Sequence, residues 1–119
     1  MIVEVNYFKN NLFIRLNGDL DMHTVPEFKK TVSKELKKNN FENLILFFKE
    51  VDFIDSTGIG AILGRYRNLK SKNREMILVG LRPQVKKVFE LSGLLKLMPV
   101  YETEKDLFSE YPGQKEENI

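Results

Sequence analysis

Residues 44–48 form an unbroken apolar run, and the segment that follows them has a different hydrophobic period. Consecutive apolar residues predict a strand that is buried on both faces, as in a parallel sheet. From Ser56 onward, apolar residues recur at three- and four-residue spacing, which predicts the buried side of a helix. A strand that leads into such a helix predicts an α/β fold. The apolar residues of the helix are Ile59, Ile62, Leu63, Tyr66 and Leu69.

A second side of the same helix carries small and polar residues. At about 100° per residue, Ser56, Gly60, Gly64, Arg67 and Ser71 fall together. A glycine inside a helix costs roughly 0.5–1 kcal/mol relative to alanine, so both glycines require an explanation. Either another molecule approaches this side closely, or the glycines allow close packing against the chain's own sheet or loops.

Asp55 and Ser56 stand where the first turn of this helix should begin. One interpretation is that either side chain is the N-cap and accepts a hydrogen bond from a backbone N–H group. The other interpretation adds a phosphate to Ser56, where the helix dipole and the unpaired N–H groups favour an anion. A charge of about −1.5 to −2 would then disturb any neutral, close contact on the small side of the helix.

Two central motifs carry a family resemblance. Residues 53–60, Phe-Ile-Asp-Ser-Thr-Gly-Ile-Gly, and residues 63–66, Leu-Gly-Arg-Tyr, resemble the signature of the STAS-domain anti-sigma-factor antagonists, most closely the sporulation type. Residues 18–21 and 85–94 resemble the same family, in matching order. The central signature is specific when both flanking motifs accompany it, and the resemblance covers nearly the whole chain.

The resemblance implies a binding protein that phosphorylation controls. The unphosphorylated chain would bind an anti-sigma factor that is also a serine kinase, and would release the sigma factor that the kinase holds. The kinase would phosphorylate Ser56, with Thr57 as the neighbouring competitor, and a serine phosphatase would reverse the modification. An antagonist of a general-stress sigma factor is the alternative within the family. The partner contacts expected from the resemblance and from the small side of the helix are Asp21, Asp55, Thr57, Gly58, Ile59, Gly60 and Gly64.

Composition limits the classes of function. A chain of 119 residues that is 42% hydrophobic suits one domain, expected at residues 1–111, with a disordered tail at 112–119. With a net charge of +2 and lysines on one helix face, the chain creates no strong electrostatic field that would attract nucleic acid or anionic membranes. Cysteine is absent, and the longest apolar run is far below the ~20 residues of a membrane span. We expect a soluble, cytoplasmic monomer without a cofactor or metal.

The remaining segments predict a mixed sheet with about four helices, which we expect on one face of the sheet. Residues 2–8 and 12–17 alternate as strands and form a hairpin, in which an asparagine of residues 9–11 takes the left-handed backbone. The other expected elements are a helix over 25–38 with a capping box at Thr24 and Glu27, a parallel strand at 76–79, a short helix between Pro83 and Gly93, an edge strand at 98–101, and a helix from a capping box at Thr103 and Asp106 through Phe108.

A small hydrolase that uses Ser56 as its nucleophile is the alternative from another class. His23 is the only histidine, so a Ser-His-Asp triad would have to include it. The Gly-x-Ser-x-Gly motif of many hydrolases is absent, because Ile54 replaces its first glycine. The helix glycines are spaced like those of a dinucleotide fingerprint, but a loop separates them from the preceding strand. We therefore predict no enzymatic activity, and we expect His23 to make a hydrogen bond within its loop.

Overall fold

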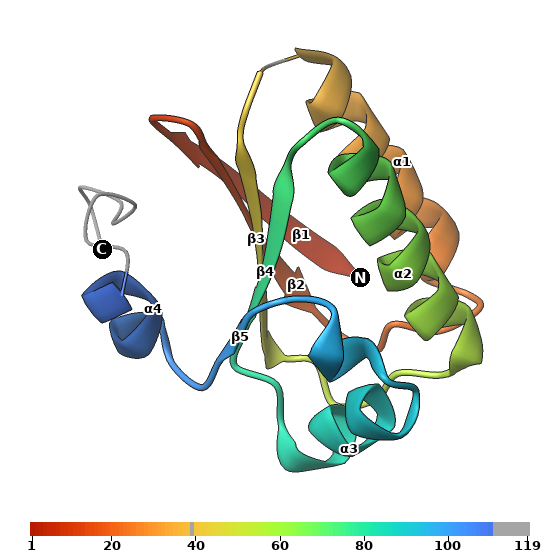
Figure 1. Ribbon diagram of the computed structural model, residues 1–119. Coiled ribbons are helices and arrows are strands. Elements are labelled where there is room, and N and C mark those ends of the chain that lie inside the picture. The colour runs from red at the N-terminus through yellow and green to blue at the C-terminus, as the bar shows by residue number, and fades with distance from the viewer. Residues whose placement is uncertain (39, 111–119) are drawn as a thin grey trace.

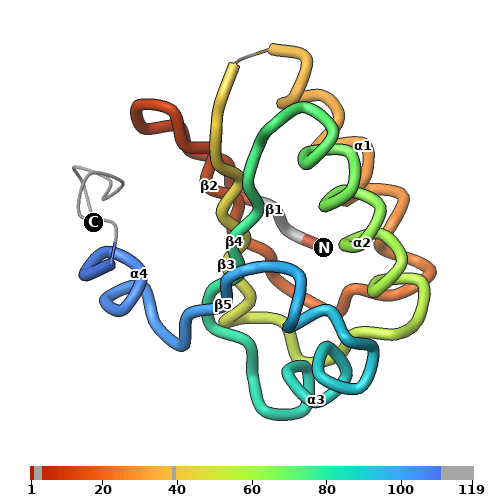
Figure 2. The backbone as a smooth tube through the Cα atoms, in the orientation of Figure 1, coloured from red at the N-terminus to blue at the C-terminus, as the bar shows by residue number. Residues whose placement is uncertain are grey.

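The computed structural model describes residues 1–38 and 40–110, so the expected domain end at 111 and the expected tail at 112–119 lie outside the described residues. Strands and helices follow one another along the chain, as Figures 1 and 2 show. The strands are β1 (Ile2–Phe8), β2 (Asn11–Asn17), β3 (Asn43–Glu50), β4 (Glu75–Val79) and β5 (Val100–Tyr101). The helices are α1 (Val25–Lys38), α2 (Ser56–Ser71), α3 (Pro83–Leu91), the short 3-10 helix η1 (Leu94–Lys96) and α4 (Glu104–Glu110).

The sheet has five strands in the order β1-β2-β3-β4-β5. β1 and β2 pair antiparallel, and each later strand pairs parallel with the strand before it. Leu12 of β2 is opposite Leu44 of β3, which in turn is opposite Met76 of β4. Each parallel connection passes through at least one helix, since parallel neighbours need a crossover. The predicted N-terminal hairpin followed by parallel strands is confirmed.

Helices cover both faces of this sheet, so the prediction that all helices lie on one face is wrong (Figure 1). Residues of α1, α2 and α3 pack on the face that carries Leu44 and Leu46. α4 packs on the other face, where Leu107 joins Ile45 and Phe47. The physical reason is that successive side chains of a strand point to opposite faces, so the apolar run of β3 needs cover on both.

Two local predictions differ from the structure, and a third is confirmed. In the turn between β1 and β2, Lys9 rather than an asparagine adopts the left-handed backbone, with φ at 54°. Before α1, the expected capping box is not formed, because the Thr24 hydroxyl turns back into the preceding loop, where it accepts the N–H group of Asp21 at 3.0 Å and donates to the Asp19 carbonyl oxygen at 2.7 Å. Before α4, the Thr103 hydroxyl accepts the N–H group of Asp106 at 3.1 Å, as the capping pattern predicts.

Candidate functional site

Asp55 is the N-cap of α2. Its backbone is extended, with φ at −106° and ψ at −175°, and its Oδ1 accepts a hydrogen bond from the Gly58 N–H group at 2.9 Å. The Asp55 carbonyl oxygen accepts the N–H group of Ile59 at 2.9 Å, which closes the first helical turn. Of the two candidate caps, Asp55 therefore makes the capping bond, and the hydroxyl of Ser56 is not needed for it.

Ser56 is the first residue of α2, and it is exposed. Within residues 1–38 and 40–110, its hydroxyl makes no hydrogen bond. The N–H groups of Ser56 and Thr57 have no acceptor in this part of the chain either, because the first N–H groups of a helix have no intrahelical acceptor and Asp55 accepts from Gly58 and Ile59 instead. An exposed hydroxyl beside such N–H groups, at the positive end of a helix, is chemically suited to carry a phosphate.

Two loops meet at the start of α2. The first loop, residues 18–24, precedes α1, and the second loop, residues 51–55, follows β3. Leu20 and Ile54 form a parallel bridge between the two loops. The Leu20 N–H group also donates to the Phe53 carbonyl oxygen at 2.9 Å. These bonds extend the parallel pairing of β2 and β3 beyond the ends of both strands.

Asp55 also holds the first loop against the helix. Its Oδ2 accepts the N–H group of Met22 at 3.2 Å, while its Oδ1 caps α2 through Gly58. One carboxylate therefore bonds to both segments. Removal of that carboxylate would loosen the start of α2 and the first loop together.

Asp21 organises the first loop from within. Its Oδ1 accepts hydrogen bonds from the N–H groups of His23 at 2.9 Å and Thr24 at 3.1 Å. Desolvation raises the pKa of the Asp21 carboxyl, but these backbone bonds and the nearby His23 favour the charged form, and the pKa lies below its usual value. Asp21 is thus an ordered carboxylate next to Met22, in the loop that α2 contacts.

Gly58 is buried and has a packing role within the domain, while its predicted contact with a partner stays a prediction. A Cβ atom at this position would lie 2.7 Å from Cγ1 of Ile54 and closer still to the Leu20 carbonyl oxygen. Glycine therefore allows the first turn of α2 to approach both loops. The signal in the sequence was ambiguous, because a glycine at the start of a helix suits an internal contact and an external one equally well.

Gly60 and Gly64 are exposed on the outer side of α2. A Cβ atom at either position would meet nothing within 4 Å, so neither glycine serves packing within the described chain. With Lys29 of α1 and Arg65 of α2, they line a shallow depression of about 250 Å³. Of the two explanations for these glycines, packing against the chain itself is wrong, and approach by another molecule stays a prediction.

Arg65 connects α2 to α1 beside this depression. Its guanidinium donates a hydrogen bond to the Ser33 hydroxyl at 3.1 Å. Burial lowers the pKa of Arg65, yet an arginine side chain remains protonated at physiological pH. The depression therefore carries the positive charges of Arg65 and Lys29, and no acidic side chain of the described residues lines it.

Two exposed apolar side chains at the site were missed by sequence reasoning. Met22 in the first loop is 64% exposed, and Phe53 in the second loop is 51% exposed. Leu20 and Ile54, which pair the loops, are buried. For Phe53 the available signal was the alternation of direction along an extended backbone, which turns the side chain next to the buried Ile54 outward, whereas Met22 lies in a turn where this alternation does not apply. The predicted residues that do lie together at the start of α2 are Asp21, Asp55, Ser56, Thr57 and Ile59, with Gly60 and Gly64 further along the helix.

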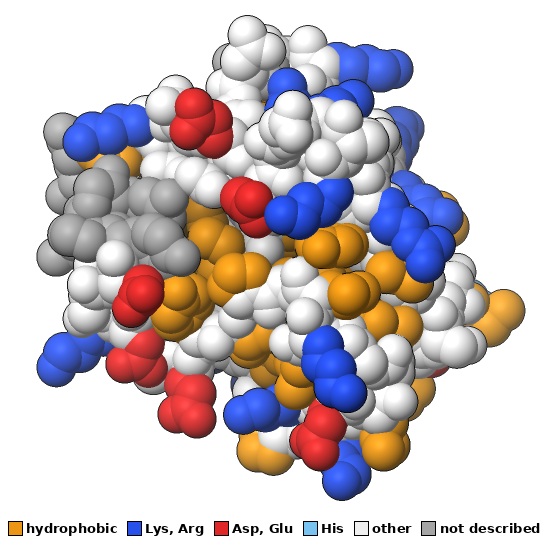
Figure 3. All heavy atoms as spheres, in the orientation of Figure 1, with side chains coloured by type: hydrophobic (Ala, Val, Ile, Leu, Met, Phe, Trp, Pro, Cys, Tyr) orange, Lys and Arg blue, Asp and Glu red, His pale blue; other side chains and the backbone are white. Residues whose placement is uncertain are grey.

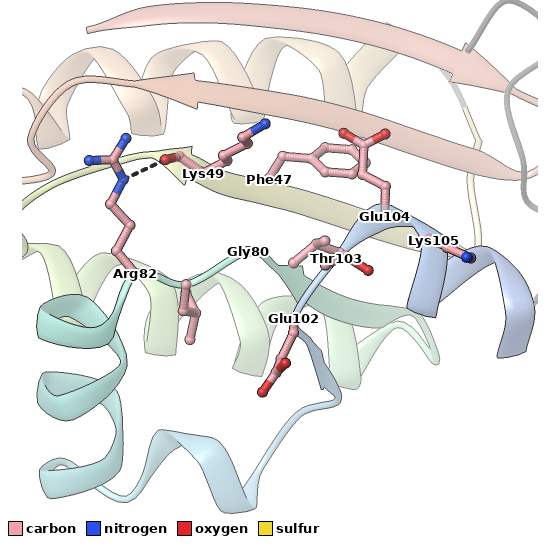
Figure 4. Close-up of a pocket in the computed structure, with 10 residues that line it drawn as sticks. Phe47, Lys49, Gly80, Arg82, Glu102, Thr103, Glu104 and Lys105 are labelled. Carbon is pink, nitrogen blue, oxygen red and sulfur yellow. Dashed lines mark hydrogen bonds between the residues drawn. The ribbon is translucent and has the colours of Figure 1, made fainter.

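A cavity of about 650 Å³ lies outside this site, at the ends of β3 and β4 and the start of α4 (Figure 4). Phe47, Glu102 and Glu104 all line it, and in Figure 4 Glu102 points away from the other two. Arg82 donates to the Lys49 carbonyl oxygen at 2.6 Å and forms ion pairs with two carboxylates. The charged groups of the cavity therefore do not converge on a common ligand position.

The geometry gives no support to a hydrolase with Ser56 as its nucleophile. In the described part of the chain, the ring of His23 forms no hydrogen bond, and the expected loop bond is made by its backbone N–H group instead. No three or more His, Cys, Asp or Glu side chains among the described residues are grouped so that they could hold a metal ion. The helices described here are all too short or too polar to cross a bilayer.

Known proteins resemble this chain over most of its length. Residues 3–107 match the model of the STAS domain. The anti-sigma F factor antagonist of Paenibacillus polymyxa is 33% identical over 108 residues, which cover 91% of this chain and 92% of that protein. This chain belongs to the STAS-domain anti-sigma factor antagonists. The anti-sigma-B factor antagonist of Staphylococcus aureus is 28% identical over 89 residues, which cover 75% of this chain and 82% of that protein.

Solved structures of one antagonist have the same fold as this STAS domain. The anti-sigma factor antagonist SpoIIAA in its unphosphorylated form matches with a TM-score of 0.78 at 30% identity, over 97% of this chain and 100% of that chain. Bacillus SpoIIAA in the phosphorylated form matches with a TM-score of 0.71 at 30% identity, over 92% of this chain and 99% of that chain. The STAS fold predicted from the sequence motifs is confirmed.

Proposed function

We propose that this STAS domain is a sporulation-type antagonist that binds an anti-sigma factor, releases its sigma factor, and loses this binding when Ser56 is phosphorylated. The observation that carries the proposal is the exposed Ser56 hydroxyl, which is free of capping at the first residue of α2. The relative SpoIIAA has been solved in unphosphorylated and phosphorylated forms, which supports phosphorylation as the regulatory change. The partner would contact the surface around Ser56, through Asp21, Thr57, Ile59, Gly60 and Gly64.

The partner supplies the chemistry, because the proposed anti-sigma factor is also a serine kinase. The Ser56 oxygen takes the γ-phosphoryl group of ATP, its proton passes to a base on the kinase, and ADP leaves. Asp55 already occupies the Gly58 N–H group, so the phosphate cannot replace it there and projects outward. Its charge of about −1.5 to −2 then lies in the contact with the partner and opposes binding. A serine phosphatase in the same cytoplasm would restore the hydroxyl.

A general-stress antagonist is the second candidate, and the Staphylococcus aureus relative supports it. The two candidates share the switch at Ser56 and differ in the anti-sigma factor that is bound. Titration with the purified anti-sigma F factor and anti-sigma-B factor of the same bacterium separates them. We expect the anti-sigma F factor to bind more tightly, and the opposite preference would favour the general-stress role.

Phosphorylation is tested with the purified chain, the anti-sigma F factor and magnesium ATP. We expect one phosphoryl group on the intact chain, mapped to Ser56 by peptide mass spectrometry. Ser56→Ala should bind the kinase and stay unmodified, Ser56→Asp should fold but not bind, and Thr57→Ala should still be modified. A phosphoryl group on another residue, or wild-type affinity in Ser56→Asp, would show that the proposed switch is wrong.

A further inference from the structure

Met22 and Phe53 are exposed apolar side chains that the core does not use. They are 64% and 51% exposed, and neither belongs to the two core clusters. Figure 3 shows other hydrophobic side chains across the middle of one face of the molecule. Partly buried side chains of α2 such as Leu63 and Tyr66 pack against the core, which explains their placement. Met22 and Phe53 have no such explanation within the described chain.

The backbone that carries these two side chains is held in place. The Met22 N–H group donates to Oδ2 of Asp55 at 3.2 Å, and the Phe53 carbonyl oxygen accepts from Leu20 at 2.9 Å. Leu20 of the first loop and Ile54 of the second loop are buried, and they bridge the two loops. A fixed backbone spares the cost of ordering the loop on binding, which favours the use of its side chains as contact residues.

We propose that Met22 and Phe53 are the apolar anchors of this surface and that they insert into a hydrophobic pocket of the anti-sigma factor, next to Ser56. This inference rests on the proposed function and adds the residues that give the contact its affinity. The Asp55 carboxylate bonds to the backbone of Met22 and immediately precedes Ser56, so the loops that carry the anchors meet at the residue next to the proposed phosphorylation site. Aromatic and methionine side chains are enriched at the centres of protein interfaces, where they dominate the binding energy.

The charge of the neighbouring depression defines the second feature of the partner. The depression extends from Gly60 to Gly64 and is bordered by Lys29 and Arg65, without an acidic side chain of the described residues. An acidic segment of the anti-sigma factor fits this depression, because the glycines leave room and the cations attract it. A phosphate on Ser56 would repel the same acidic segment. The modification would therefore weaken the contact with the anti-sigma factor to which the anchors also contribute.

The test is calorimetric titration of full-length variants with the purified anti-sigma F factor of the same bacterium. Phe53→Ser should weaken binding about 30-fold and Met22→Ser about tenfold, since both remove a buried interface side chain. Lys29→Glu should weaken binding about tenfold, and more at low salt than at high salt. Thermal unfolding should shift by no more than about 2 °C in each variant, because all three side chains are exposed.

Matched controls separate the anchors from a general loss of exposed apolar or basic groups. Leu91→Ser removes a side chain that is 77% exposed at the end of α3, and Lys37→Glu makes the same charge change at the far end of α1. Both controls should bind as the wild type does. Wild-type affinity in both Phe53→Ser and Met22→Ser would overturn the anchors and leave the proposed function standing. If the wild type does not bind, both the anchors and the proposed function are wrong. If the wild type is a dimer that Phe53→Ser dissociates, the surface binds a second copy of this chain and the anchor proposal is wrong.

Discussion

Gly58→Ala should destabilise this domain, whereas Gly60→Ala and Gly64→Ala should stabilise it, although each change adds one methyl group to the same helix. At position 58 the new Cβ atom would lie 2.7 Å from Cγ1 of Ile54 and 3.2 Å from the carbonyl carbon of Leu20. Both distances are shorter than ordinary van der Waals contact, and the Leu20 atoms belong to the backbone, which cannot rotate away. At positions 60 and 64 the new Cβ atom meets nothing within 4 Å.

The magnitudes follow from these distances. Overpacking a closed site costs typically about 1–3 kcal/mol, and we expect about 2–3 kcal/mol for Gly58→Ala because backbone must move. At an exposed position inside a helix, alanine gains about 0.5–1 kcal/mol over glycine, which applies to Gly60→Ala and Gly64→Ala. For a domain of this length, 1 kcal/mol corresponds to about 3–5 °C in Tm.

Urea and thermal unfolding, followed by circular dichroism, measure the free energy of unfolding and Tm of the three variants beside the wild type. The reasoning requires opposite signs at position 58 and at positions 60 and 64. A Gly58→Ala variant as stable as the wild type would refute the close approach of the first loop to α2. A loss of more than about 1 kcal/mol in Gly60→Ala or Gly64→Ala would refute the open outer side of the helix.

Three further predictions test the site. Gly64→Leu should leave Tm nearly unchanged and lower the affinity for the anti-sigma factor at least about tenfold, as measured by titration; a large loss of Tm would return Gly64 to a packing role. Asp55→Ala should lower the free energy of unfolding by about 1–2 kcal/mol in urea titrations, because the cap and the bond to Met22 are both lost, and an unchanged midpoint would contradict this. The folded-state pKa of Asp21 lies below its ordinary value of 3.8, so its contribution to stability is present above that value and is lost as pH falls through the lowered pKa. Asp21→Asn should therefore reduce the loss of stability on acidification, measured as unfolding midpoints between about pH 6 and pH 2. If the unfolding midpoint of the variant falls with pH as steeply as that of the wild type, the contribution of Asp21 is wrong.

Most of the fold could be predicted because its strands and helices have clear periods. The apolar run of β3 and the three- and four-residue spacing in α2 are local sequence patterns, and each indicates the element that the structure contains. The placement of α4 could not be obtained in this way, since Leu107 contacts Ile45 and Phe47 of a distant strand. The information was present in the run at residues 44–48, because an apolar side chain at every position requires cover on both faces.

The site was less predictable, because identical residue types have different surroundings. Gly58 and Gly60 belong to the same helix, yet one meets the first loop and the other meets solvent. The difference between the two glycines depends on the three-dimensional path of residues 18–24, which the residue types do not show. In the same way, the pattern at Thr24 is that of a capping box, but the loop offers its hydroxyl other partners, since the hydroxyl accepts the N–H group of Asp21 and donates to the Asp19 carbonyl oxygen. Phe53 lies between Asp52 and Ile54 in the sequence, and the loop backbone turns Ile54 inward and Phe53 outward.

The two oxygens of the Asp55 carboxylate have a consequence for how well the domain would tolerate a reversible modification of the neighbouring serine. They bond to the first loop and to α2, and neither bond involves the neighbouring hydroxyl. A serine that also capped the helix would weaken the domain each time it was modified, and every cycle would expose the chain to unfolding and proteolysis. If Ser56 is modified as proposed, the division of the two tasks between adjacent residues lets the molecule pass through many rounds of addition and removal without loss of its helix cap.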